Sequence, residues 1–140
     1  MKKILIGICL ILGIALVLYY KTHPLSASVT IKGKIYLVDI AITGKDKEKG
    51  LGYRKSMPEN HGMLFIYDHK EQYQFGMKNM QFPLDFLWLN GNEIVEITKH
   101  VPITSPTIKP NMLIDKVVEL NAGQVDQLGI VVGDTVLFNK

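Results

Sequence analysis

The hydrophobic pattern divides the chain into one long apolar run and a following series of short β-rich segments. Residues 4–20 carry no charge, and from residue 29 onward apolar positions come in short runs separated by Gly, Pro and Asn. Short runs rich in Val, Ile, Phe and Tyr predict strands. We expect about seven strands, at residues 29–41 (a pair broken near Gly33, or one long strand), 62–67, 73–77, 84–89, 92–98, 112–120 and 130–138.

Two short helices are predicted between these strands. Residues 43–51 are highly charged and begin with Thr43, a favourable N-cap residue. Residues 121–129 have a helical pattern with Asn121 as the N-cap and Gly129 at the end. These helices accompany the strands without forming a layer of their own.

The turn signals complete the expected fold. Asn90-Gly91 lies between two β-rich runs and predicts a tight hairpin. Residues 101–111 contain three prolines and predict an irregular crossing loop. The chain is therefore expected to be mainly β (α+β), a small barrel-like or strongly curved antiparallel sheet with two short helices.

The apolar run at residues 4–20 predicts one N-terminal transmembrane helix. At about 1.5 Å rise per residue its length is roughly 25 Å, enough for a thin bilayer core. A cleaved signal peptide is the alternative, with a weak cleavage site near residues 25–27. Lys2 and Lys3 favour a cytoplasmic N-terminus and an exported domain in either case. The expected division is an anchor or signal at 1–21, a linker at 22–28 and a β-rich exported domain at 29–140.

Composition excludes several classes of function for this domain. Cys9 is the only cysteine and lies in the apolar run, so a disulfide, a thiolate nucleophile and a cysteine-ligated metal are excluded. Thirteen basic and thirteen acidic residues follow residue 28, and a neutral domain is untypical of a nucleic-acid partner. No histidine pair has metal-ligand spacing, so we expect neither a metal nor another cofactor.

Residues 75–86, FGMKNMQFPLDF, place polar side chains among residues that otherwise indicate core. In a strand, Asp85 would share a face with Leu87 and Leu89, and a carboxylate there is costly unless it is paired. Lys78 and Asn79 are the nearest polar groups. They predict either a structural ion pair with Asp85 or a site in which Lys78 and Asn79 bind an anionic or carbonyl group.

Other polar residues complete the pool of candidate site residues. Arg54 and His61 lie in the polar region before the strand at 62–67. Asn121 is expected to cap its helix, and Glu119, which shares a strand face with Asp115, is expected to be exposed. The full candidate cluster is Lys78, Asn79, Asp85, Arg54, His61, Glu119 and Asn121.

Three blocks of the sequence carry a resemblance to a known family. GLGYRKSMPENHGMLF, FGMKNMQFPLDFLWL and VVELNAGQVDQLGIVVGD resemble the hallmark blocks of domain of unknown function family 192. The resemblance covers residues 29–138 and implies a small β-barrel-like domain with short helices, preceded by a signal or anchor. Two positions depart from the pattern: Gly52 replaces a common methionine, and Gly76 replaces a usual tryptophan.

Two functions follow as hypotheses, because the family implies no established reaction. The first is a membrane-anchored, exported module that binds an unknown protein or small molecule without catalysis. The alternative is a hydrolase- or transferase-type enzyme that uses Lys78, Asn79 and Asp85, helped by His61 or Arg54.

Overall fold

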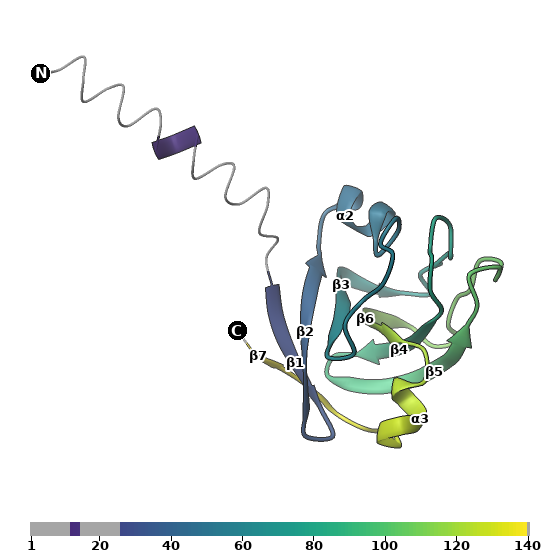
Figure 1. Ribbon diagram of the computed structural model, residues 1–140. Coiled ribbons are helices and arrows are strands. Elements are labelled where there is room, and N and C mark those ends of the chain that lie inside the picture. Colours follow the sequence, from purple (N-terminus) through teal and green to yellow (C-terminus); the bar gives the residue numbers. More distant parts are fainter. Residues whose placement is uncertain (1–11, 15–25, 140) are drawn as a thin grey trace, which may run out of the picture.

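The computed structural model describes residues 12–14 and 26–139 (Figure 1). In these ranges no helix combines the length and the hydropathy that a membrane span requires. The predicted anchor at residues 4–20 lies outside the described residues except for 12–14.

Residues 26–139 form seven strands and two short helices. The strands are β1 (Ser26–Ile31), β2 (Lys34–Ala41), β3 (His61–Glu71), β4 (Leu84–Asn90), β5 (Glu93–Val101), β6 (Ile114–Asn121) and β7 (Val136–Asn139). The helices are α2 (Gly44–Lys49) and α3 (Gln124–Leu128), at opposite ends of the sheet (Figure 1). The prediction of a mainly β domain with two short helices is confirmed for this range.

All seven strands belong to one sheet in the order β5-β4-β6-β3-β2-β1-β7. Every neighbouring pair is antiparallel except β2 and β3, which are parallel. The prediction of a purely antiparallel sheet is therefore wrong at this pair. A parallel pair needs a crossover, and α2 with the following loop supplies it.

The sheet is curled so far that its two edge strands meet at one end. Glu93 of β5 forms a bridge with Thr135, just before β7. The Ile94 amide donates to the Asp134 carbonyl at 3.0 Å, and the Val136 amide donates to the Asn92 carbonyl at 2.8 Å. The barrel-like curvature expected from the short strands is confirmed.

Strand β4 shows how the curled sheet acquires two cores. Leu87 and Leu89 point into a core that draws on all seven strands. Phe86 and Trp88 point to the opposite face, into a second core roofed by residues of the loops. Residues 84–89 are all buried because both faces of β4 are covered.

The predicted hairpin is present, and residues 29–41 form a second one. β1 and β2 pair through a turn at Lys32 and Gly33, both with positive φ, so residues 29–41 form a pair of strands. β4 and β5 pair with Asn90 opposite Glu93, so the loop is Gly91-Asn92, one residue later than expected. Gly91 has φ 65° at the first central position, where type II′ turns favour glycine.

Two predicted strands are wrong in extent. Residues 73–77 make only a bridge between Phe75 and Ile108. Phe75 and Met77 are nevertheless buried in the second core. The alternating apolar residues at 73–77 therefore belong to a loop that covers the sheet and not to a strand. In the predicted strand at 130–138, only Val136–Asn139 is a strand, because Gly133 at φ 95° lies in a turn.

Candidate functional site

The predicted ion pair between Lys78 and Asp85 is absent from the described residues. Asp85 is fully buried, and its carboxylate accepts three backbone N–H groups, from His100 at 2.8 Å, Gly123 at 2.9 Å and Val125 at 3.0 Å. The apolar face is thus compatible with a carboxylate because main-chain amides satisfy it. Asp85 is a structural clasp, but its partners are not those expected.

Asp85 also explains how α3 begins. The N-cap of this helix is Gly123 in the left-handed conformation, with no side-chain cap of its own. The predicted cap, Asn121, instead donates its side-chain amide to the carbonyls of Met57 at 2.8 Å and Pro58 at 3.2 Å. Asp85 takes the capping role from β4, 38 residues earlier in the chain.

Asn79 fastens the turn that carries Lys78. Its side-chain amide donates to the Tyr53 hydroxyl at 2.8 Å, and the Tyr53 amide donates to the Asn79 carbonyl at 2.9 Å. Both residues have positive φ. A Cβ at Gly52 would lie 3.0 Å from the Lys49 carbonyl, so glycine relieves crowding within the turn that follows α2.

Arg54 and His61 have other partners than the Lys78–Asn79 turn. Arg54 forms a 2.6 Å ion pair with Asp39 on β2. His61 is half-buried at the start of β3, opposite Leu37 of β2. Of the candidate cluster, only Lys78 and Glu119 line a common cavity, although the Arg54 charge also acts on Glu119.

Glu119 is buried, so the expectation that it is exposed is wrong. It lies opposite Phe86 of β4 and Met63 of β3, and Met63 lies opposite Asp39 of β2. This row crosses the face of the sheet that the loops cover. Glu119 therefore has an exposure of 5 % although it belongs to a strand with polar residues at its start.

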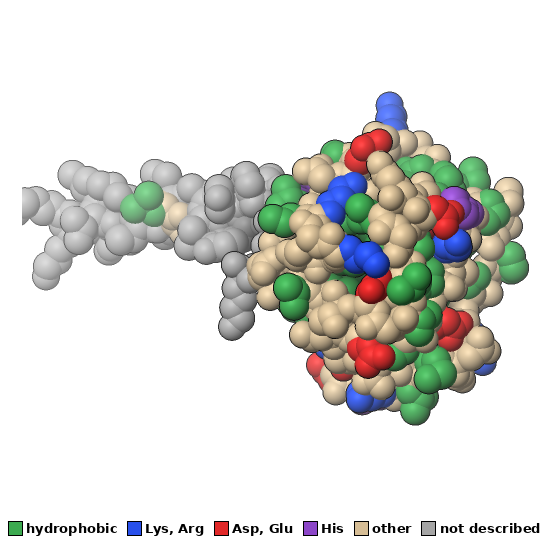
Figure 2. All heavy atoms as spheres, turned by 90° about the horizontal axis from the view of Figure 1, so that it is seen from below, with side chains coloured by type: hydrophobic (Ala, Val, Ile, Leu, Met, Phe, Trp, Pro, Cys, Tyr) green, Lys and Arg blue, Asp and Glu red, His purple; other side chains and the backbone are tan. Residues whose placement is uncertain are grey.

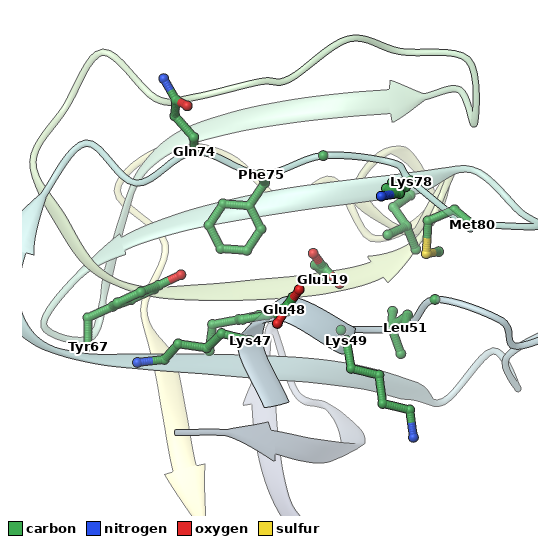
Figure 3. Close-up of a pocket in the computed structure, with 15 residues that line it drawn as sticks. Lys47, Glu48, Lys49, Leu51, Tyr67, Gln74, Phe75, Lys78, Met80 and Glu119 are labelled. Atoms are coloured by element: carbon green, nitrogen blue, oxygen red, sulfur yellow. The ribbon is translucent and has the colours of Figure 1, made fainter. Parts of the chain in front are cut away.

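A pocket of about 380 Å³ opens above Glu119 (Figure 3). One wall is the end of α2 and the following turn, and the opposite wall is the segment at residues 74–80. β3, β4 and β6 form the floor. The lining residues are Lys47, Glu48, Lys49, Gly50, Leu51, Gly52, Phe65, Tyr67, Gln74, Phe75, Gly76, Lys78, Met80, Leu84 and Glu119.

The Glu119 carboxyl has no hydrogen-bond partner among the described residues, where every enclosed side-chain oxygen or nitrogen is hydrogen-bonded. Its oxygens therefore reach the open space of the pocket, as Figure 3 shows. Burial raises the pKa of Glu119 to about 8, and the Arg54 charge opposes the rise. At neutral pH this carboxyl is mainly protonated and both donates and accepts hydrogen bonds.

The aromatic wall of the pocket is tightly packed. Tyr67 stacks on Tyr73 with ring centroids 3.5 Å apart, and the Lys47 ammonium lies 4.1 Å from the Tyr67 centroid. Phe75 meets Phe65 edge-to-face at 4.9 Å. Burial raises the pKa of Tyr67, with smaller contributions from Tyr73 and Glu119. These rings give the pocket a rigid apolar side.

Most pocket residues were not predicted as site residues. Lys47 and Glu48 come from a helix with no buried residue, which its sequence presents as a solvated surface. Tyr67 and Phe75 lie in apolar segments whose sequence pattern is typical of a protein core. The one usable sequence signal was Gly76, which replaces a tryptophan that is usual in the family pattern. In the structure a Cβ at Gly76 would have no atom within 4 Å, so the pocket wall has open space there.

The described residues 12–14 and 26–139 contain no group of three His, Cys, Asp or Glu side chains able to hold a metal ion. Acidic and basic side chains are interspersed over the face seen from below in Figure 2. The pocket, with the buried carboxyl of Glu119 at its floor, is thus the most distinctive polar feature of the described domain.

A known protein family covers nearly all of residues 26–139. The model of domain of unknown function family 192 (DUF192), described as Uncharacterized ACR, matches residues 27–138. The chain belongs to this family. No curated protein is significantly similar to this DUF192 chain.

Two solved structures are similar to this DUF192 protein. A candidate transcription regulator from Sinorhizobium meliloti 1021 is 31% identical, with a TM-score of 0.77 over 82% of this chain and 95% of the other. A protein of unknown function from Novosphingobium aromaticivorans DSM 12444 is 25% identical, with a TM-score of 0.71 over 81% and 84% of the two chains. The curled sheet is shared with both.

Proposed function

We propose that this DUF192 protein is a non-catalytic binding module that holds a small ligand in the Glu119 pocket. One observation carries the proposal: a carboxyl that is 5 % exposed has no hydrogen-bond partner among the described residues and faces an open cavity. Because its oxygens reach the cavity, a ligand that enters can exchange hydrogen bonds with Glu119 without displacing a protein partner.

The geometry favours binding over the catalytic alternative. A hydrolase or transferase that uses Lys78, Asn79 and Asp85 together requires the three side chains to converge. Asp85 lies opposite Leu120 and Glu119 lies opposite Phe86, so Asp85 and the pocket are on different faces of the sheet. Asp85 is fully buried and bonded to three backbone amides, and Asn79 is bonded to Tyr53.

The proposal can be tested by filling the pocket. Gly76→Trp adds a large side chain at a lining position where a Cβ has open space. Gly44→Trp is the matched control, since Gly44 also has open space but does not line the pocket. NMR screening of small-molecule fragments should find ligands that bind the natural protein and the control but not Gly76→Trp.

Two results would contradict this function. The binding proposal fails if no fragment binds the natural protein and loses that binding in Gly76→Trp. Chemical conversion of a bound fragment, lost in Glu119→Gln, would replace the non-catalytic module with an enzyme.

We also propose that residues 4–20 anchor this module in a membrane, with the domain on the extracytoplasmic side. The support is the uncharged run between Lys3 and Lys21. The protein should stay with membranes through a high-salt wash and leave them only in detergent. A mature protein that begins near residue 28 would favour the alternative, a secreted or periplasmic domain released by cleavage.

A further inference from the structure

We infer that the pocket takes a small aromatic organic acid whose hydroxyl group meets Glu119 and whose carboxylate lies at the lysines of the rim. This inference rests on the proposed function and names the ligand class for the same pocket. The floor, the walls and the rim each contribute a separate requirement.

The floor requires a neutral hydrogen-bonding group on the ligand. Glu119 lies between the segment at residues 74–80 and α2, with its carboxyl directed into the cavity (Figure 3). Its protonated form donates one hydrogen bond and accepts others, which matches a hydroxyl group. A ligand without such a group would leave the carboxyl unsatisfied, and that omission is costly in a buried site.

The walls require an apolar, preferably flat, middle section. Phe65, Phe75 and Leu51 line the cavity beside Glu119, and all three are buried. Both faces of the Tyr67 ring are occupied, one by Tyr73 and the other by the Lys47 ammonium. The cavity of about 380 Å³ is at the small end of ligand sites, so a single ring fits the space better than a chain of several groups.

The rim favours an anion. Lys47, Glu48 and Lys49 belong to α2, while Lys78 comes from the opposite wall. In Figure 3 the Glu48 carboxylate points toward Glu119 and the Lys49 ammonium points away from it, so Lys78 is the lysine of the facing wall. Neither Lys49 nor Lys78 forms an ion pair among the described residues. An incoming cation would meet this excess of positive charge, whereas a carboxylate would gain from it.

Three probes that share one ring separate these requirements. 4-Hydroxyphenylacetate carries both the hydroxyl and the carboxylate, phenylacetate lacks the hydroxyl, and tyramine replaces the carboxylate with an ammonium group. Titration of the isotope-labelled full-length protein in detergent micelles would give each dissociation constant from the NMR shifts of pocket residues. We expect 4-hydroxyphenylacetate to bind about tenfold more tightly than either of the others.

Variants assign the two ends of the ligand. Lys78→Met should weaken 4-hydroxyphenylacetate by about tenfold. Lys45→Met, which removes an exposed lysine of α2 that does not line the pocket, should leave its affinity unchanged. Glu119→Gln keeps a neutral hydrogen-bonding group and should retain binding, but only the natural protein should lose affinity as the pH rises through about 8.

The possible failures are distinguishable. Tighter binding of tyramine, or equal binding of phenylacetate, would overturn the ligand class while the binding function stands. Absence of binding by all three probes would also overturn it, and the fragment screen with Gly76→Trp would then decide the proposed function separately.

Discussion

Two buried carboxyl groups of neighbouring strands have opposite surroundings. Asp85 on β4 accepts three backbone amides and joins β5 and α3 to the sheet. Glu119 on β6 has no hydrogen-bond partner among the described residues and faces the pocket. A sealed carboxylate with three protein donors is out of reach of a ligand, whereas a carboxyl that lines a cavity without a protein partner can bind one. We therefore assign structure to Asp85 and binding to Glu119.

Removal of the Asp85 charge should destabilise the fold. Asp85→Asn weakens or removes amide bonds to a buried carboxylate, and we expect the free energy of unfolding to fall by about 3 kcal/mol. Asp68→Asn, at an exposed position of β3, should change it by less than about 0.5 kcal/mol. Chemical denaturation of the variants measures both values.

The same method tests whether Lys78 stabilises Asp85. Because no contact joins the two side chains in the described structure, Lys78→Met and Asp85→Asn should be additive within about 0.5 kcal/mol. A coupling energy well above about 1 kcal/mol would restore the ion pair expected from the sequence.

At the scale of elements, local patterns predicted strands and turns but not the pocket. The apolar run of β4 predicted a strand, and Asn90-Gly91 predicted a hairpin, because both signals are local in the sequence. The pocket depends on α2, β6 and residues 74–80, which are far apart in sequence. Glu119 seemed a solvated strand residue because no sequence signal shows that a loop covers its face.

Gly62 links β3 to the strand that carries Glu119. A Cβ at this position would lie 2.7 Å from the Glu119 carbonyl oxygen and 2.9 Å from Leu120. Gly62→Ala must therefore displace β6, and we expect a loss of about 1–3 kcal/mol in the free energy of unfolding. A stability equal to that of the natural protein would show that the strands can separate without cost.

At the scale of the whole molecule, the curled sheet separates a sealed core from a ligand-accessible face. The inner core draws on all seven strands and is closed where β5 meets β7. The outer face is covered by loops that leave the cavity above Glu119. The sealed core supports the fold while the outer face keeps a cavity lined by a carboxyl.

This arrangement predicts how the stability of the molecule depends on pH. Glu119 has a pKa of about 8 in the folded protein and an ordinary value of 4.5. Between these values the folded state retains a proton that the unfolded state has released, so the Glu119 contribution to the free energy of unfolding falls as pH rises. Denaturation of the natural protein and Glu119→Gln across pH 4 to 9 should show that only the former has this component, with a slope approaching about 1.4 kcal/mol per pH unit.

The central claim is that Glu119 is a buried carboxyl without a protein partner, held open to a ligand. Its most direct test is an NMR titration of the Glu119 side-chain carboxyl carbon in the ligand-free protein, assigned by comparison with Glu119→Gln. We expect a midpoint near pH 8, because burial favours the protonated form more strongly than the Arg54 charge opposes it. A midpoint near the ordinary value of 4.5 would mean that burial does not govern this carboxyl, and would contradict the claim.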